Sequence, residues 1–237
     1  MIKNEEVKTS PKQRIVIILI AIFMLGSTFA PYAGIVLNYN QPAKTANTEK
    51  EARFNKLYEE YQNELDQQAK ILSNTYFPEF SQYKGRVRSF NAASANELKV
   101  EDLKIGSGRE LTTITDYNYA AYYIGWLADE TIFDSSFDNN SAPTALSRPL
   151  TGTSAMIQGW LEGISRNTDD NGNVIWEGMR IGGIREITIP AVLAYGDQDN
   201  GTIPAGSPLK FVVMIIEKPE DVPVSEELEQ LYAELYG

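Results

Sequence analysis

The sequence predicts an α+β protein in which a mostly antiparallel sheet half-wraps one short helix, preceded by a transmembrane helix and a long amphipathic helix. Three observations support this prediction. An uncharged apolar run lies near the N-terminus, a helical spacing of apolar residues follows at about 48–73, and short runs rich in β-branched and aromatic residues alternate with turns from Leu98 onward. The change of period from about 3.6 to about 2 residues marks the passage from helix to sheet.

The N-terminal region predicts a membrane anchor. Residues 15–37 form a run of 23 uncharged residues, and a hydrocarbon core about 30 Å thick needs about 20 apolar residues. Basic residues precede this run, so the positive-inside rule makes 1–14 a cytoplasmic tail and places the rest of a single-pass membrane protein outside the cytoplasm. The alternative is a signal peptide cleaved near Ala30, which would release a secreted protein.

A polar spacer from residue 38 leads into an amphipathic helix at about 48–73. Thr48 and Glu51 match a capping box at its start. Residues on one stripe recur at spacings of four and three: Phe54, Tyr58, Tyr61, Leu65, Gln68 and Leu72. Two interpretations stay open: the stripe packs on the chain itself or serves as a stalk, or it joins two copies in a homodimer. Pro78 and Gly85 then predict an irregular linker up to residue 97.

The segment 98–218 is expected to hold the sheet and its short helix. Between the strands, SAMIQGWLEGI is a helix candidate with Ser154 as its N-cap. Four stretches are strand-like, namely LKVEDLKIGSG, YNYAAYYIGWL, REITI and LKFVVMIIEK.

Residues 219–237 predict an acidic C-terminal helix after two prolines. Ser225 is a suitable cap for it, with glutamates in the first turn. Four apolar residues share one face of this helix: Leu228, Leu231, Tyr232 and Leu235. We expect this face to dock on the protein or on a second copy.

The composition excludes several classes of function. The 237 residues carry a formal net charge of −11, which disfavours contact with the phosphates of a nucleic acid. The chain has no cysteine and no histidine, so thiol nucleophiles, zinc–thiolate sites, serine–histidine triads and histidine-ligated metals are excluded. We predict no cofactor, no metal and no nucleic-acid partner. An enzyme built on this chain must use carboxylates, hydroxyls or shape.

Four motifs occur in a fixed order within the sheet segment. They are FDSS at 133–136, IQGW at 157–160, LAYG at 193–196 and IPAGSPLKF at 203–211. In order and spacing they resemble the motifs of the FKBP-type peptidyl-prolyl cis-trans isomerases, and the joint match is far more specific than any single motif. The resemblance covers about half of the chain and says nothing about the anchor, the long helix or the C-terminal helix.

The resemblance implies a twisted antiparallel sheet of five or six strands curled around a short helix, with a shallow apolar pocket between them. It assigns a catalytic group to this pocket, comprising Tyr123, Phe133, Asp134, Trp160, Tyr195 and Phe211. It assigns a substrate-binding group comprising Met156, Ile157, Ile203 and Leu209. Taken singly, each of these residues has an ordinary reading as a core or turn residue. Their joint appearance in the order of the family favours the pocket.

The resemblance also implies a role for individual residues. Trp160 is the floor on which a proline ring rests, and Gly159 before it lets the helix approach the sheet. The backbone N–H of Ile157 and the hydroxyl of Tyr195 bond the backbone of the substrate, and Asp134 lies inside the pocket. The walls are formed by Tyr123, Phe133 and Phe211.

The implied reaction suits a chain without histidine or cysteine. The X-Pro peptide bond rotates over a barrier of about 18–20 kcal/mol without breaking, so no nucleophile or general base is needed. An apolar pocket favours the twisted amide, whose carbonyl is less polar. The expected substrates are proline-containing polypeptides that are unfolded, exported or on the cell surface. The alternatives are a catalytically weak proline-binding chaperone and a scaffold module at the membrane.

Two stretches depart from the family pattern. Residues 141–152 lack the aromatic residue that family members typically carry, and Leu146 or Leu150 is the candidate substitute. The insertion RNTDDNGNVIWE at 166–177 predicts a β-hairpin that turns at Asn171–Gly172 and projects beside the pocket, with Trp176 as an extra substrate contact. A calcium loop is the less favoured interpretation, because the last carboxylate falls one residue short.

Overall fold

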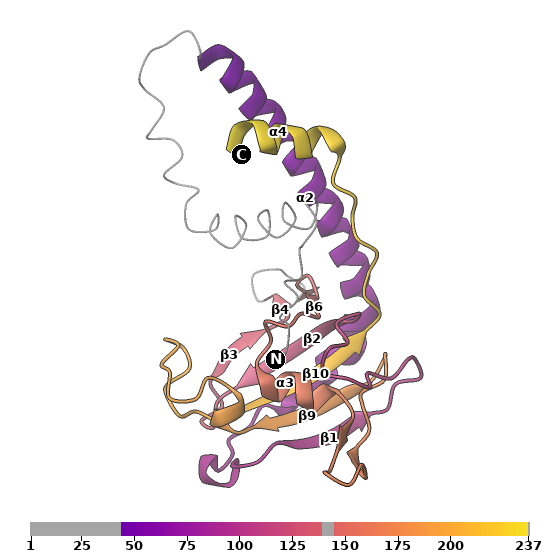
Figure 1. Cartoon of the computed structure of the whole chain (residues 1–237), viewed down its shortest axis with the longest axis vertical. Helices are drawn as coiled ribbons and strands as arrows, with labels where there is room; N and C mark the ends of the chain where they lie inside the picture. Colours follow the sequence, from indigo (N-terminus) through magenta and orange to yellow (C-terminus); the bar gives the residue numbers. More distant parts are fainter. Residues whose placement is uncertain (1–43, 139–144, 237) are drawn as a thin grey trace, which may run out of the picture. The chain divides into compact units, whose positions relative to one another are not determined.

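The computed structural model describes residues 44–138 and 145–236 (Figure 1). The predicted cytoplasmic tail, the predicted anchor at 15–37 and the start of the spacer lie outside these ranges. Over the described ranges, the structure has no helix that combines the length and the apolar character needed to cross a bilayer.

The chain divides into two compact units. Over the described residues, one comprises 44–63 together with 222–236, and the other comprises 64–138 together with 145–221. The boundary falls within helix α2 (Lys44–Phe80), which contributes residues to both units.

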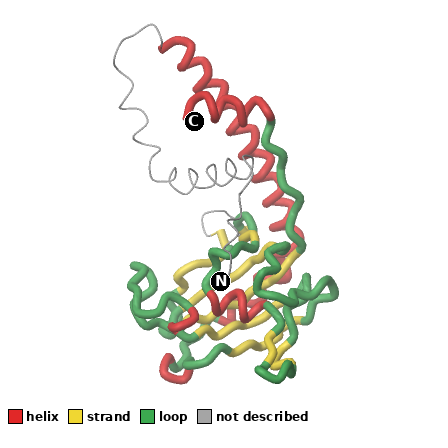
Figure 2. The backbone as a smooth tube through the Cα atoms, viewed as in Figure 1, coloured by secondary structure: helices red, strands yellow, loops and turns green. Residues whose placement is uncertain are grey.

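The larger unit holds a six-stranded antiparallel sheet, shown in Figure 2. Its main path runs through β1 (Lys99–Lys104), β9 (Ile184–Ile189), β10 (Leu209–Ile216), β2 (Ala120–Trp126) and β3 (Ile132–Ser135), and β6 (Leu150–Thr151) pairs with the start of β2. The prediction of an α+β fold with an antiparallel sheet is therefore confirmed. Short pairs of strands lie off this sheet, β4 (Phe137–Asp138) with β5 (Ala145–Leu146) and β7 (Asn167–Thr168) with β8 (Val174–Trp176).

Helix α3 (Gln158–Ile164) packs against β9 on one face of the sheet. Two glycines make this close approach possible. A Cβ atom at Gly159 would lie 2.3 Å from a methyl carbon of Ile189, and one at Gly163 would lie 2.7 Å from a methyl carbon of Ile187. Neither distance is sterically allowed, so only glycine fits at these positions. This explains why a glycine directly precedes Trp160.

The start of α3 differs from the prediction that Ser154 is its N-cap. The N-cap position is held by Ile157, which makes no side-chain capping bond. Residues 154–156 form a turn instead, in which the N–H of Ala155 donates to the hydroxyl of Thr153 at 3.3 Å. The serine is therefore displaced from the helix by about one turn.

The second face of the sheet is covered by the C-terminal part of α2. The residues that form this buried layer, here called the back-face cluster, include Phe80, Ala120, Tyr122, Ile124, Trp126, Phe137, Val212 and Met214, with Leu72, Tyr76 and Phe77 packed on it. β2 and β10 are thus buried on both faces, which accounts for their continuous apolar runs.

This layer corrects the predicted bounds of the long helix. α2 starts at Lys44, so the Thr48–Glu51 pair lies inside the helix and is not its cap. It ends at Phe80, so the predicted linker begins later. Pro78 lies inside the last turn, where its missing N–H leaves one intrahelical hydrogen bond unmade. Packing on the sheet nevertheless continues the helix and its apolar stripe beyond Leu72. Two 3₁₀ turns then follow, at Ser81–Arg86 and Ala92–Ser94.

In the smaller unit, helix α4 (Glu226–Tyr236) packs on the N-terminal part of α2. Phe54 and Leu228 are buried at this contact, and Arg53 forms an ion pair with Glu227 at 2.7 Å. The hydroxyl of Ser225 accepts a hydrogen bond from the N–H of Leu228 at 3.2 Å, which confirms the predicted capped C-terminal helix.

Much of the apolar stripe of α2 therefore packs on residues of the same chain. Its N-terminal half contacts α4, and Leu72 packs on the back-face cluster. Gln68, the polar residue of the stripe, donates its amide to the carbonyl of Glu220 at 2.8 Å. The homodimer through residues 48–73 stays a prediction, and much of the stripe it would use packs within the chain.

The insertion at 166–177 forms the predicted hairpin. Gly172 has a positive φ of 82°, as a tight turn requires. The carboxylate of Asp169 accepts hydrogen bonds from the backbone N–H groups of Asn171 and Asn173, at 2.9 and 2.8 Å. These bonds hold the turn and occupy the carboxylate that the calcium interpretation needed.

Candidate active site

Four aromatic rings from four different elements meet on the α3 side of the sheet. Tyr123 comes from β2, Phe133 from β3, Phe211 from β10 and Trp160 from α3. The centroid of the Phe211 ring lies 5.3 Å from that of Trp160 and 5.5 Å from that of Phe133, and Tyr123 lies 5.6 Å from Trp160. These three contacts are edge-to-face, with interplanar angles of 84–89°. We call these four residues the aromatic cluster.

The space for the aromatic cluster is made by a glycine on β2. A Cβ atom at Gly125 would lie 2.6 Å from the ring of Phe211 and 2.7 Å from the ring of Phe133. Gly125 pairs with Phe211 in the register of β2 and β10, and with Asp134 in the register of β2 and β3. The missing side chain therefore lets two rings lie over the strand.

Trp160 lies at the bottom of the cluster, with only 1% of its surface exposed. Its indole N–H donates to the hydroxyl of Tyr119 at 3.3 Å. Tyr119 is itself fully buried, and burial raises the pKa of its hydroxyl, which stays protonated. No sequence pattern predicts this bond, because the two residues are 41 positions apart.

Tyr123 and Asp134 form the polar contact of the cluster. The Tyr123 hydroxyl donates to one carboxylate oxygen of Asp134 at 2.5 Å, and the other oxygen accepts the N–H of Ser135 at 2.8 Å. Burial raises the pKa of Tyr123, and the hydrogen bond to Asp134 and the charge of that carboxylate raise it further. Tyr123 therefore stays protonated and keeps its role as donor.

The remaining predicted residues surround the cluster at different depths. Met156 and Ile157 are half-buried and pack against it, and Tyr195 is 37% exposed. Within the described part of the chain, the backbone N–H of Ile157 has no hydrogen-bond partner. Ile203 and Leu209 are buried in the core beside the cluster, so Leu209 supports the site from beneath rather than lining its surface.

The two candidate replacements for the missing aromatic residue fall on opposite faces of the sheet. Leu150, at the start of β6, packs against the core that contains the aromatic cluster. Leu146, in β5, belongs to the back-face cluster and pairs with Phe137. Leu150 is therefore the residue whose position fits the substitution.

Trp176 does not join the site as predicted. Its indole N–H donates to the carbonyl of Ser165 at 3.0 Å, just after the end of α3. It lines a separate cleft whose walls include none of the ten predicted site residues. The hairpin points away from the pocket because the insertion follows the C-terminal end of α3, whereas Trp160 and Ile157 lie at its N-terminal end.

Comparison with known proteins places this geometry in a family. The family model described as FKBP-type peptidyl-prolyl cis-trans isomerase matches residues 111–216. A protein of Neisseria meningitidis serogroup A named FK506-binding protein is 34% identical over 124 residues, which cover 51% of this chain and 94% of that protein. The chain belongs to the family of FKBP-type peptidyl-prolyl cis-trans isomerases.

Other members of the isomerase family match over a similar stretch. FK506-binding protein 2 of Debaryomyces hansenii is 38% identical over 98 residues, covering 41% of this chain and 61% of that protein. An FKBP-type peptidyl-prolyl cis-trans isomerase of Aeromonas hydrophila named FkpA is 33% identical over 128 residues, covering 53% of this chain and 40% of that protein. The crystal structure of AtFKBP13 is 32% identical, with a TM-score of 0.41, and covers 52% of this chain and 93% of that chain.

Proposed function

We propose that this isomerase binds a proline ring at the aromatic cluster and accelerates rotation about the preceding peptide bond. The observation that carries the proposal is the meeting of four aromatic rings around the Tyr123–Asp134 contact. Tyr123 and Phe133 are partly exposed beside the buried rings of Trp160 and Phe211 and offer an apolar surface. The Tyr123 hydroxyl, paired with a carboxylate, is held in one orientation. Such a site can hold a substrate without needing a nucleophile or a general base.

The rate increase comes from stabilising the twisted amide more than the planar one. Rotation breaks amide resonance, which costs about 18–20 kcal/mol. The twisted amide has a less polar carbonyl, so it loses less solvation than the planar amide on entering an apolar site. Only this difference between the two states accelerates the reaction, and each 1.36 kcal/mol or so of it gives about a tenfold rate increase.

Two polar groups at the edge of the cluster support orientation of the substrate. The unpartnered N–H of Ile157 is a donor for the carbonyl of the residue before proline. The exposed hydroxyl of Tyr195 is a donor for the substrate backbone further along the chain. Each of these hydrogen bonds replaces one that the group makes with water, so its net contribution to binding energy is small. Their role is to fix the position of the substrate backbone while the aromatic cluster holds the proline ring.

The substrates we propose are unfolded or exported polypeptides that contain proline, met on the outer side of a membrane. The support is the run of 23 uncharged residues at 15–37 and the basic residues before it. In this proposal the catalytic unit is held at the cell membrane as part of a single-pass protein. Fractionation of cells, followed by N-terminal sequencing of the protein, distinguishes an anchored chain from one cleaved near Ala30.

The activity is tested with the full-length chain and a Leu-Pro tetrapeptide. We expect the cis-to-trans relaxation to accelerate in proportion to protein concentration. Trp160→Ala should lower kcat/KM at least about tenfold, and Asp134→Ala should lower it by a similar or smaller factor, because each removes part of the aromatic cluster or its polar contact. A chain that binds proline peptides but leaves their relaxation unchanged would favour the alternative of a proline-binding chaperone module.

A further inference from the structure

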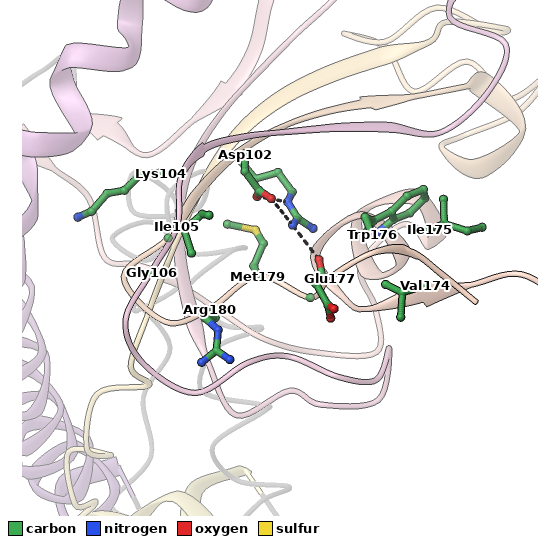
Figure 3. A pocket seen from close by; sticks show the side chains of 13 residues that line it. Asp102, Lys104, Ile105, Gly106, Val174, Ile175, Trp176, Glu177, Met179 and Arg180 are labelled. Atoms are coloured by element: carbon green, nitrogen blue, oxygen red, sulfur yellow. Dashed lines mark hydrogen bonds and ion pairs between the residues drawn. The ribbon is translucent and has the colours of Figure 1, made fainter. Parts of the chain in front are cut away.

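A second cleft lies beside the inserted hairpin, shown in Figure 3. It has a volume of about 570 Å³ and is walled by the end of β1, the strand β8 and the segment 177–185. Asp102, Ile105, Ile175 and Trp176 are among its lining residues. None of the ten residues predicted for the proline site contributes to it.

The rim of this hairpin cleft carries three exposed aliphatic side chains among its charged residues. Ile105 is 77% exposed, Ile175 is 57% exposed and Val174 is 47% exposed, and all three line the cleft. Trp176 is half-buried next to them. Large aliphatic side chains that gather around a hollow mark an interaction site more often than isolated exposed ones do.

The charged groups of the cleft are already paired within the protein. Asp102 accepts two hydrogen bonds from the buried guanidinium of Arg185, at 2.7 and 3.0 Å. Glu177 pairs with Arg166 at 2.8 Å, and Lys104 pairs with Glu79 at 2.5 Å. An occupant that carried charge would have to compete with these pairs. The walls therefore favour an uncharged, apolar occupant.

The backbone around the cleft suits an extended chain. β1 is an edge strand of the main sheet, and β8 pairs only with β7 over the described residues. Each strand therefore has one edge whose N–H and C=O groups are not used in a ladder. Open strand edges next to apolar side chains are a common way to bind an extended polypeptide.

The cleft and the proline site lie at opposite ends of α3. Arg185 donates to the carbonyl of Gly163 at 2.9 Å, and Trp176 donates to the carbonyl of Ser165 at 3.0 Å, so the cleft adjoins the C-terminal end. Ile157 and Trp160 lie at the N-terminal end. The helix spans Gln158–Ile164, or about 10 Å at 1.5 Å per residue. An extended chain covers that distance with a few residues, at about 3.3 Å each.

We propose that the hairpin cleft is a second polypeptide-binding site, which holds an extended, uncharged apolar segment of the same substrate chain whose X-Pro bond lies at the aromatic cluster. This inference rests on the proposed function, because it assumes that the substrate is a polypeptide. The cleft raises the affinity for long unfolded chains and leaves the chemistry of the X-Pro bond unchanged. Short peptides that end before the cleft gain nothing from it.

The test compares two substrates on the same full-length protein variants. Ile105→Ser combined with Ile175→Ser removes the apolar rim, and Ile114→Ser is the matched control, since Ile114 is also exposed but does not line the cleft. The short substrate is the Leu-Pro tetrapeptide, and the long one is an unfolded protein whose refolding is limited by proline isomerisation. We expect the double variant to keep its tetrapeptide rate and to show a KM for the refolding protein at least about fivefold higher.

A direct binding measurement completes the test. The probe is a fluorescent, extended peptide of leucine, valine and serine without proline, followed by anisotropy. We expect the Kd of the double variant for this peptide to be at least about fivefold higher than that of wild type, while the Kd of Trp160→Ala is unchanged. Retention by the double variant, or loss in Trp160→Ala instead, would overturn the proposal.

The outcomes separate the two proposals. An inactive wild type on both substrates contradicts the proposed function, whereas normal tetrapeptide activity with unchanged KM for the refolding protein contradicts the hairpin cleft alone. The self-association of wild type and double variant is compared by sedimentation. If the wild type self-associates and the double variant does not, while refolding catalysis is the same in both, the cleft binds a second copy of the chain and the proposal is overturned.

Discussion

The two faces of the main sheet are both rich in aromatic residues, but they use them differently. On the α3 face, the rings of the aromatic cluster meet edge to face, and both hydroxyl groups that touch it are hydrogen-bonded. On the other face, Phe80 at the end of α2 stacks flat on Phe137 at 5.3 Å, and Phe77 meets Phe137 edge to face. There, the hydroxyl of Tyr122 is buried and has no partner among the described residues.

Under the proposed function, this difference separates a binding surface from a packing surface. A packed layer gains most from excluding water, and it can be completed by any residues that fill the space. A binding surface must keep some of its apolar side chains accessible and must hold its polar atoms in fixed directions. Tyr123, which is half-exposed and bonded to Asp134, meets both conditions, and Tyr122 next to it meets neither.

The largest effect we expect on the back face is on stability. Phe80→Ala removes a fully buried ring at the end of α2 and should lower the free energy of unfolding by about 3–5 kcal/mol. Under conditions where the variant is folded, its kcat/KM on a tetrapeptide should stay within about twofold of wild type. Urea unfolding and the isomerase assay measure both. A large loss of activity in the folded variant would mean that the two faces are coupled.

The second expected effect is a loss of stability at high pH that both faces share. Burial raises the pKa of Tyr119, Tyr122 and Tyr123. In the unfolded chain these hydroxyls ionise near pH 10, while in the folded chain they stay neutral. Their contribution to stability is therefore complete below about pH 10 and falls as the pH rises further, by up to about 1.4 kcal/mol per pH unit for each group.

Unfolding by urea between about pH 8 and pH 11 checks this expectation. Tyr122→Phe should make the decline above about pH 10 shallower, because one ionisable hydroxyl is removed. A decline of equal slope in the variant would show that the burial of this tyrosine does not contribute.

A smaller effect should appear when one hydroxyl is removed on the α3 side. Tyr119→Phe leaves the indole N–H of Trp160 without its buried acceptor, which costs about 1–3 kcal/mol. Tyr119 acts through Trp160 as a positioning residue, so we expect kcat/KM to fall severalfold, with a change in the indole fluorescence. An unchanged fluorescence and an unchanged rate would show that the bond does not orient the ring.

The smallest effect, and one of opposite sign, belongs to the matched change on the back face. Tyr122→Phe removes a buried hydroxyl that has no partner among the described residues. Stability near neutral pH should stay the same or rise by up to about 1 kcal/mol, because a desolvated polar group is lost. Activity should not change. A destabilised variant would indicate that ordered water satisfies this hydroxyl.

The fold of the isomerase segment could be predicted from sequence because its motifs are specific and ordered. The four motifs predicted the sheet, the helix α3 and the rings of the aromatic cluster, and Gly159 indicated the close contact between helix and sheet. The roles proposed for those rings are still predictions. The extension of α2 was missed because Pro78 suggested a break in the helix. The sequences of β2 and β10 lack the alternation of apolar and polar residues expected for a sheet with one solvent-exposed face, which indicated that another element covers the second face.

Other features depend on contacts that no local pattern encodes. The bond between Trp160 and Tyr119 joins residues from different elements. The direction of the hairpin depends on which end of α3 the insertion follows, and sequence proximity to the IQGW motif suggested the wrong end. The N-cap of α3 was missed because a favourable serine lay one turn too early, in a turn of its own.

The buried guanidinium of Arg185 shows how the chain accommodates a longer connection. Its hydrogen bonds reach Asp102 on β1, the carbonyl of Gly163 at the end of α3 and the carbonyl of Glu177 at the end of the insertion. A guanidinium has several N–H donors, so it can bond the carbonyl groups at the end of α3 and at the end of an inserted loop at the same time. An insertion can therefore be joined at this point while the packing of α3 on the sheet is kept.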